Sequence, residues 1–455
     1  MRTRTERRAA ARYRWDRVKV SFWFAPVIMA IAAVLLAWLI YWVDSLVPNA
    51  ALEDSRFVLA GTPGELRTAL LSMAGTVLAT AGVVFTLLTL PLSTVASQYG
   101  SRLLRVFLAD RTTQFVLGAF VGTFVYCLAA ALSIPPAGSG QEAPQVIATV
   151  GVYLMLATFG TLILLVQHIS TMLQAPNISA AAGAELLNVV RASAEDVTGS
   201  DSSDGEVETE PVPDSQGIPA MLTEAKGHPV RARRAGYIQY VDPQIVLTLA
   251  RKENLVIQLL RRPGHYVQSG AVVALLWPAA RVDEHLETLF RRAIQVGNGR
   301  TPSQDVEYAV NQLTEMAVRA MSPAINDPFT AMTCLDHIGD GLVAFIRQGG
   351  NNSQYYDRDG RLLLVLEPVT FGDLLSAAFD MLRHASCSNA SVLLHMLKVI
   401  EMISHEAKAR ETREQLLRHV SLIHAECQVG NLIEADRQSI HRSVESLRTR
   451  LMGEL

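Results

Sequence analysis

The sequence predicts a mainly α-helical membrane protein, in which a four-helix transmembrane bundle precedes a cytoplasmic part with a small β module and an α-helical C-terminal region. Three observations predict this fold class. Long uncharged stretches lie before residue 170, an acidic segment without basic residues follows them, and the remainder has the dispersed charges of a soluble domain.

Four hydrophobic stretches predict the membrane spans. They run over about residues 22–43, 69–92, 116–134 and 146–166. Each is long enough to cross roughly 30 Å of hydrocarbon as a helix and holds no Asp, Glu, Lys or Arg. Aromatic residues at both ends of the first stretch, among them Trp23 and Trp42, are typical of a span seated between two interfaces.

The basic residues predict the orientation, because Lys and Arg are retained on the cytoplasmic side of a membrane. The tail before the first span is rich in Arg, and the loop between the second and third spans holds Arg102, Arg105 and Arg111. The loop between the third and fourth spans has no basic residue. Both termini are therefore expected in the cytoplasm.

Small residues form a pattern in the second and third spans. Gly75, Ala79, Gly82, Thr86 and Thr89 recur at steps of four and three, so they share one helical face, and the third span carries Gly118 and Gly122. One interpretation is helix packing within the four-helix bundle, since small residues let backbones approach closely. The other is the lining of a pore in an oligomer, where the Thr hydroxyls face water.

The segment between these two spans, residues 97–114, has the pattern of an amphipathic helix that lies on the inner leaflet. Arg102 and Arg105 lie away from its apolar side, and Arg111 begins the third span. These three residues are candidates for contacts with lipid phosphates. The alternative is a solvated connection that only anchors the chain.

Several short motifs carry a family resemblance that covers nearly the whole chain. They are Ser97-Gln98-Tyr99, Arg102-Leu103-Leu104, Asp110-Arg111-Thr112-Thr113-Gln114, Leu117-Gly118, Gly122-Thr123-Phe124-Val125-Tyr126-Cys127, Ser322-Pro323-Ala324-Ile325-Asn326-Asp327-Pro328-Phe329-Thr330-Ala331 and Ala378-Phe379-Asp380. In these motifs the chain resembles the bacterial family of predicted membrane proteins called domain of unknown function 2254. The resemblance implies a multi-pass protein of a bacterial inner membrane, and it implies no activity.

Three regions are expected after residues 1–191, which hold the N-terminal tail and the spans. Residues 192–217 are acidic and poor in large apolar residues, which predicts a disordered linker. Residues 218–280 predict a small β module, with strands at 237–240, 245–249, 255–260, 266–268 and 272–276. The run from Pro263 to Val273 resembles half of a biotinyl/lipoyl-type barrel-sandwich, but the modifiable Lys of that group is missing. Residues 281–455 predict a mainly helical domain.

Polar residues around two predicted helices of that domain are the candidate cytoplasmic site. A carboxylate pair near a His can run acid/base chemistry or hold a divalent cation, but capping of helices explains several of these residues equally well. The candidates are Asp305, Glu307, Asn311, Glu315, Asn326, Asp327, Asp336 and His337.

Other sites are disfavoured. His384 with Cys387 and His424 with Cys427 each stand one helical turn apart, a spacing that lets a pair share a metal, but neither is accompanied by a second pair at zinc spacing, and no cofactor is expected. The net charge of −3 argues against nucleic-acid binding. No phosphate loop, His-Glu-x-x-His or Gly-x-Ser-x-Gly motif is present in the sequence, so an enzyme is not expected.

Two hypotheses of function lead, with membrane lipids as partners in both. The first is a homo-oligomeric, channel-like or transport-related membrane scaffold. The alternative is a non-conducting sensor or adaptor that binds an unidentified protein partner through its cytoplasmic domain. A membrane hydrolase that uses the polar candidates is a third and weaker hypothesis.

Overall fold

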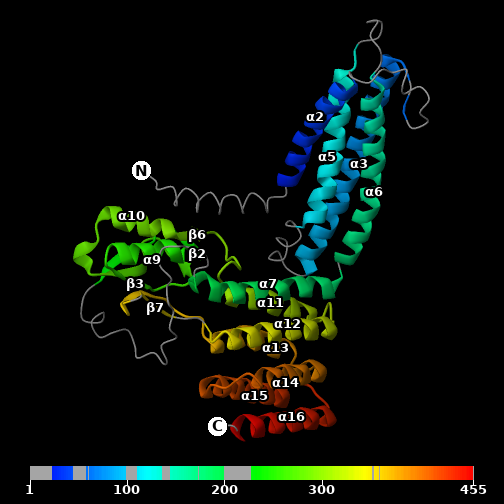
Figure 1. Cartoon of the computed structure of the whole chain (residues 1–455). Helices are drawn as coiled ribbons and strands as arrows, with labels where there is room; N and C mark the ends of the chain where they lie inside the picture. The colour runs from blue at the N-terminus through cyan, green and yellow to red at the C-terminus, as the bar shows by residue number, and fades with distance from the viewer. Residues whose placement is uncertain are drawn as a thin grey trace. The chain divides into compact units, whose positions relative to one another are not determined.

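The computed structural model describes residues 23–44, 58–59, 61–98, 110–135, 144–172, 174–198, 227–350, 353–357 and 359–453. The chain divides into two compact units, Met1–Asn177 and Ile178–Leu455 (Figure 1). Each unit has its own apolar core. The predicted mainly α-helical class is confirmed, and a small part of the second unit is β-sheet.

Four long helices form the first unit and match the four predicted spans: α2 (Phe24–Asp44), α3 (Pro63–Gln98), α5 (Arg111–Ser133) and α6 (Gln145–Met172). In a hydrocarbon environment every backbone N–H and C=O group must be paired within the protein. A helix pairs these groups within a single segment, so long apolar segments form helices there. Helix α5 is central: it contacts α2, α3 and α6, and 56% of its most apolar stretch is buried, against 17–22% in the other three.

Two aspartates bond the bundle helices at their ends. Asp44, the last residue of α2, accepts a hydrogen bond from the backbone N–H of Ile147 at the start of α6, at 3.1 Å. Asp110 caps α5 by accepting from the N–H of Thr113 at 2.7 Å, and it lies 3.0 Å from Nε2 of His168 near the end of α6. Helix α6 is therefore fixed to a neighbour at each end.

A fifth described helix, α12 (Pro328–Arg347), is also long and apolar enough to cross a membrane. The sequence predicts four spans, and length and composition alone admit this fifth. Within the second unit α12 packs against three further helices: α11 (Val306–Ala320), α13 (Phe371–Ala385) and α14 (Ala390–Ser404). Gly339 and Gly341 bring it close to Val399 and Leu186, so α12 is a core helix of that unit.

The β-structure of the second unit forms two sheets. Five strands have the order β1 (His228–Arg231), β5 (Val272–Trp277), β3 (Val256–Leu259), β8 (Leu362–Val365) and β7 (Gln354–Tyr356). Three have the order β4 (Tyr266–Val267), β2 (Gly236–Val241) and β6 (Ile294–Gly297). All neighbours are antiparallel except β3 and β8, where Ile257 pairs with Leu364.

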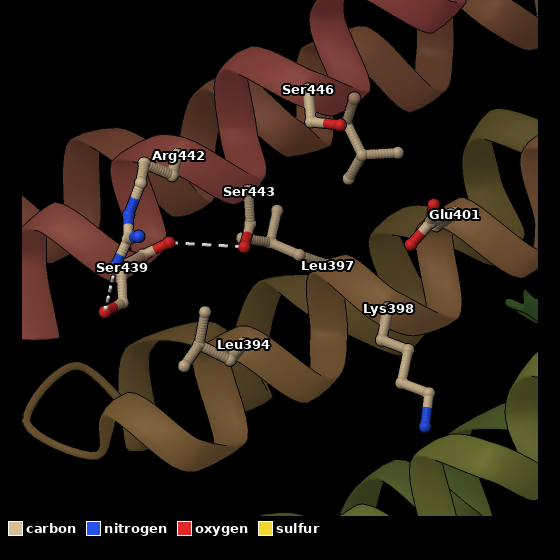
Figure 2. Close-up of a pocket in the computed structure, with 9 residues that line it drawn as sticks. Leu394, Leu397, Lys398, Glu401, Ser439, Arg442, Ser443 and Ser446 are labelled. Carbon is tan, nitrogen blue, oxygen red and sulfur yellow. Dashed lines mark hydrogen bonds between the residues drawn. The ribbon is translucent and has the colours of Figure 1, made fainter.

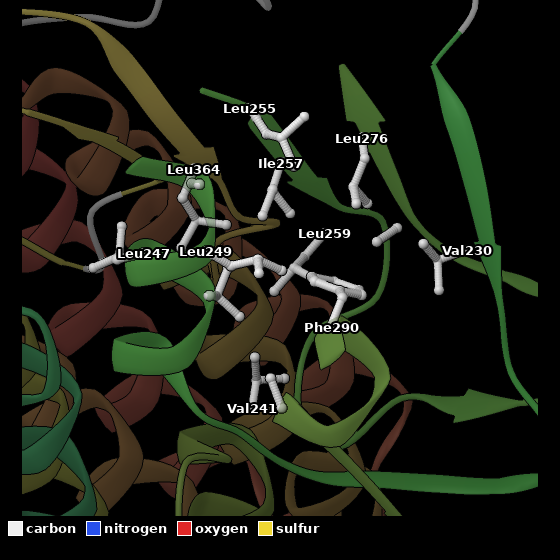
Figure 3. Close-up of a cluster of buried hydrophobic side chains, with 14 of the residues drawn as sticks. Val230, Val241, Leu247, Leu249, Leu255, Ile257, Leu259, Leu276, Phe290 and Leu364 are labelled. Carbon is white, nitrogen blue, oxygen red and sulfur yellow. The ribbon is translucent and has the colours of Figure 1, made fainter. Parts of the chain in front are cut away.

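The predicted strand at residues 245–249 is wrong, because these residues belong to helix α9 (Pro243–Lys252). Asp242 caps this helix by accepting from the N–H of Ile245 at 3.1 Å, and Pro243 occupies its first turn. Helices α9 and α10 (Glu284–Ala293) lie among the strands and bury Leu247, Leu249 and Phe290 in one core with the strands (Figure 3). The expected barrel-sandwich is not confirmed.

The helices of the second unit lie in a stack (Figure 1), and their contacts divide them into two layers. Helix α11 contacts α13, and α13 contacts α15 (Arg410–Val429). In the other layer α12 contacts α14, and α14 contacts α16 (Glu434–Gly453). Each helix therefore packs on the next but one in the sequence, as in helical repeat proteins.

Helix α7 (Ala175–Thr198) packs on this array at α12. A Cβ atom added to Gly183 would lie 2.7 Å from Cγ of His337, and Leu186 contacts Gly341. The helix extends to Thr198, into the first part of the predicted linker, and residues 199–217 lie outside the described residues.

Candidate functional site

The small residues of α3 lie on the outside of the bundle. Gly75, Ala79, Gly82, Thr86 and Thr89, here called the α3 face, are all exposed. A Cβ atom added to either glycine would meet nothing within 4 Å. The opposite side of the helix carries the buried residues Leu66, Leu70, Ala74, Val77, Val84 and Leu88. Among the described residues, the α3 face therefore lies on the surface of the bundle.

The hydroxyls of the α3 face are bonded to their own helix. Thr86 Oγ1 donates to the carbonyl of Gly82 at 3.1 Å, and Thr89 Oγ1 donates to the carbonyl of Thr86 at 3.0 Å. Both residues can therefore stand in an apolar environment without an unsatisfied donor.

Gly118 and Gly122, in contrast, are packing residues inside the bundle. A Cβ at Gly118 would lie 2.5 Å from Sδ of Met29, and one at Gly122 would lie 3.3 Å from the Met29 carbonyl oxygen. The absence of side chains here lets α5 approach α2 closely. These two glycines therefore belong to a different feature from the α3 face.

The interior of the bundle is closed around α5. Thr123 and Thr158 share a buried hydrogen bond of 2.7 Å, and the Tyr126 hydroxyl donates to the carbonyl of Ile147 at 2.9 Å. Apolar side chains fill the remaining core on both sides of these bonds. The described core of one bundle is therefore packed with side chains around α5.

The predicted lipid contacts are described only in part. Arg102 and Arg105 lie outside the described residues, whereas Arg111 is exposed as the first residue of α5. Its neighbour Asp110 forms the cap and the contact with His168.

In the second unit Asp305 is held by a buried ionic contact. Its carboxylate accepts from Nε and Nη2 of Arg300 at 2.8 and 2.9 Å, and it caps α11 through the N–H of Tyr308 at 2.9 Å. Burial alone would lower the pKa of Arg300, but the hydrogen bonds and charges of Asp305 and Glu307 raise it above its ordinary value. Asp305 is thus fully engaged and is not a free base.

Arg262 joins the starts of two helices. Its Nη2 lies 2.8 Å from Oε2 of Glu307 on α11, and its Nη1 donates to the Pro368 carbonyl at 3.0 Å and lies 3.5 Å from Asp373 on α13. Burial would raise the pKa of Asp373, but hydrogen bonds from Thr370 and the charge of Arg262 lower it below its usual value. The contacts tie the loop after β3 to α11 and α13.

The other predicted polar residues lie elsewhere. Asp327 caps α12 through the N–H of Thr330 at 3.1 Å, and Asn326 before it is exposed with a φ of 48°. Because α11 has 15 residues, roughly 20 Å separate Asp305 from this turn. Asn311 is half-buried one turn after Glu307.

Asp336 and His337 are adjacent in the sequence but contact different helices. Asp336 Oδ1 lies 2.7 Å from Nε2 of His395 on α14, whereas His337 packs against Gly183 of α7. Glu315 lies 3.0 Å from Arg319 on its own helix. The structure therefore disperses the predicted cluster over at least three places and gives each acidic residue a cap or ionic partner.

No group of three or more His, Cys, Asp and Glu residues with metal-binding geometry occurs among the described residues. His384 Nδ1 lies 3.1 Å from Glu426, and His424 Nε2 lies 3.3 Å from His441 Nδ1. Cys427 is buried. Neither His–Cys pair forms a site with a second pair.

His419 is a buried histidine that the sequence reasoning missed. It lies on α15 and is fully buried, and neither of its ring nitrogens has a hydrogen-bond partner in the part of the chain that the structure describes. Its Nδ1 is 3.9 Å from Asp380 of α13. Burial lowers the pKa of His419 to about 4, Asp380 opposes that change, and the charges of Arg418 and Arg383 add to it.

Sequence reasoning also missed a groove between α14 and α16, and Figure 2 shows its lining. Its volume is about 420 Å³, which is within the range of small-molecule sites. The lining residues are Leu394, Leu397, Lys398, Glu401, Ser439, Arg442, Ser443, Ser446 and Leu447. The only signal in the sequence is a row of serines at helical spacing, which is also the pattern of an ordinary solvated helix face.

An apolar four-helix bundle followed by a large second unit of sheet and stacked helices defines a membrane protein with several candidate spans. The chain belongs to the family of predicted membrane proteins called domain of unknown function 2254, whose family model matches residues 19–402.

Relatives and solved structures add no activity. Uncharacterized proteins of Mycobacterium bovis and Mycobacterium tuberculosis are each 27% identical to this chain over 391 residues, which is 85% of this chain and 72% of theirs. No solved structure matches the chain significantly.

Proposed function

We propose that the protein is a self-associating, channel-like membrane scaffold whose subunits meet along the α3 face. The observation that carries this proposal is the exposure of the whole α3 face on the side of α3 opposite its buried residues. Small residues on a lipid-facing surface gain little from lipid tails but allow a second helix to approach closely.

The neighbouring helix α2 offers a contrast that supports the proposal. Its outer side carries bulky side chains, including Ile31, Leu35 and Trp38, which are between 57% and 68% exposed. Such a surface suits lipid tails and interfacial anchoring. The α3 face differs from it in size and in its hydroxyl content.

A conduit, in this proposal, lies between subunits. Apolar side chains fill the described core of one bundle, where Thr123 bonds Thr158 and Tyr126 bonds the carbonyl of Ile147. An assembly around the α3 faces would place Thr86 and Thr89 near its axis, where their oxygens retain the capacity to accept hydrogen bonds from water.

The proposal includes an orientation in a bacterial inner membrane. The basic residues of the loop that ends at Arg111, together with the Arg-rich tail, favour both termini on the inner side. The second unit is then cytoplasmic.

Gly82→Leu tests the proposal. In detergent micelles the wild-type chain is expected to sediment as an oligomer, and the variant should associate roughly tenfold more weakly or worse, equivalent to about 1.4 kcal/mol. In liposomes the wild-type chain is expected to pass ions under voltage or tension, and the variant should lose this flux.

Gly160→Leu is the matched control, because Gly160 of α6 is equally open, with nothing within 4 Å of an added Cβ. This variant should keep both association and flux. A strictly monomeric wild-type chain, or an equal loss in the two variants, would contradict the proposal.

A membrane-anchored adaptor is the second candidate, favoured by the α14–α16 groove in the second unit. It predicts a monomer without flux whose second unit binds a ligand. The hydrolase hypothesis is not proposed again, because Asp305 and Asp327 are engaged in caps and an ion pair.

A further inference from the structure

Two histidines face each other across the helix pair α15 and α16. Nε2 of His424 on α15 lies 3.3 Å from Nδ1 of His441 on α16, and the centroids of the two rings are 5.2 Å apart. The two helices pack on each other, so their backbones hold both rings in place. His424 is half-buried and His441 is exposed, so the pair lies at the surface, where an ion from solvent can reach it.

The distance between the two nitrogens matches that of two ligands on one metal ion. Zn²⁺ binds imidazole nitrogen at about 2.0–2.1 Å with tetrahedral geometry, so two nitrogens on the same ion stand about 3.3–3.4 Å apart. The separation of 3.3 Å between His424 and His441 lies in this range. Protein N–H donors usually lie about 2.7–3.2 Å from an oxygen acceptor, so this separation is long for a hydrogen bond.

A third polar group approaches the same nitrogen of His424. The side-chain amide of Gln428, one turn further along α15, has its Nε2 3.5 Å from Nε2 of His424. A half-turn of the amide would present its oxygen at this place instead. An imidazole and an amide therefore converge on His424 Nε2 from two different helices.

The imidazole of His424 is available to a metal near neutral pH. Burial lowers the pKa of His424 below its ordinary value, the charges of Arg448 and His441 add to this change, and Glu445 opposes it. Metal binding requires the neutral imidazole, so a lowered pKa keeps a lone pair free for the ion. Arg448 Nη1 lies 3.0 Å from Oε1 of Glu445, so these two neighbouring charges largely cancel.

We infer that His424 and His441 bind one divalent transition-metal ion, such as Zn²⁺, between α15 and α16. Imidazole suits Zn²⁺, Cu²⁺ and Ni²⁺, whereas Mg²⁺ and Ca²⁺ require several oxygen ligands, and this difference selects the class of metal. No third His, Cys, Asp or Glu joins the pair among the described residues, so the Gln428 amide and water fill the remaining positions of the ion.

Zinc binding to the full chain, without a polyhistidine tag and in phosphatidylcholine nanodiscs, tests the inference. Calorimetric titration with Zn²⁺ should show a saturable site for which Mg²⁺ does not compete. His441→Ala should weaken this binding roughly a hundredfold, because the second ligand of a pair acts at a high effective concentration. Lowering the pH to about 5 should also weaken it, since a protonated imidazole does not bind a metal.

His405→Ala is the matched control, because His405 is an exposed histidine outside the pair, at the end of α14. This variant should bind Zn²⁺ as the wild-type chain does. Unaltered circular dichroism of His441→Ala will show that its loss of binding is not a loss of fold. Absence of a saturable site, or equal binding by wild type and His441→Ala, would overturn the inference. The test is independent of the α3 face, which belongs to the first unit.

Discussion

Acidification should destabilise the second unit through His419. The ring is fully buried, without a hydrogen-bond partner, so the folded protein holds it neutral and its pKa falls from 6.5 to about 4. The unfolded chain takes up the proton near pH 6.5, whereas the folded chain does not until about pH 4. The contribution of His419 to stability is therefore complete above pH 6.5 and is lost as the pH falls toward 4.

The magnitude follows from the two pKa values. Each pH unit between them removes about 1.4 kcal/mol, so at pH 5 the folded state has lost about 2 kcal/mol relative to pH 8. For a unit of this size, that loss lowers the unfolding temperature by roughly 4–8 °C. Thermal unfolding of the full chain in nanodiscs, followed by circular dichroism at pH 8 and pH 5, measures it.

His419→Leu isolates this effect from the other titrating groups. The substitution places an apolar side chain of similar size against Phe379 and removes the titrating group. The variant should lose about 2 kcal/mol less than wild type between pH 8 and pH 5. His405→Leu, at an exposed position after α14, is the control and should behave as wild type. If wild type and His419→Leu lose the same stability on acidification, the reasoning is refuted.

Two further predictions concern the contacts between the sheets and the helical array. Gly264→Ala should destabilise the second unit by more than about 1 kcal/mol, because Gly264 has a φ of 94° and an added Cβ would collide with the Asp305 carboxylate. Gly270 has a φ of 83° but lies in open space, so Gly270→Ala should have the smaller effect when both variants are measured by thermal unfolding. Arg262→Gln should lower stability by about 1–3 kcal/mol, since it removes the ion pair with the partly buried Glu307 and the hydrogen bond to the Pro368 carbonyl. Arg410→Gln, whose ion pair is exposed, should change it by less than about 0.5 kcal/mol, and equal effects of the two Arg substitutions in chemical denaturation would contradict the structural role of Arg262.

The bundle was predictable from the sequence because, in hydrocarbon, a single long apolar stretch can pair its own backbone groups only as a helix. The direction in which the α3 face points was not predictable, since a stripe of small residues does not reveal whether it faces the bundle or the outside. Only the buried residues on the opposite side of α3, such as Val77 and Val84, decide that question.

In the second unit, some predictions of secondary structure and of polar sites were wrong or incomplete. The apolar run at residues 245–249 fits a strand, yet Asp242 and Pro243 start a helix there, as Asp327 and Pro328 do for α12. The polar candidates were recognisable as caps, but Arg262, the partner of Glu307, comes from a distant loop and carries no signal at the capping positions.

The parallel pair of β3 and β8 sets an order on how the second unit can be completed. Ile257 meets Leu364 only after α10, α11 and α12 have been synthesised, so the larger sheet has an open edge until then. A nascent chain that stops before β7 would expose the backbone amides of β3 to any extended segment nearby. Folding of the larger sheet is thus complete only after α10, α11 and α12 are made. Truncation in the loop before β7 should therefore yield an aggregating fragment rather than a smaller domain.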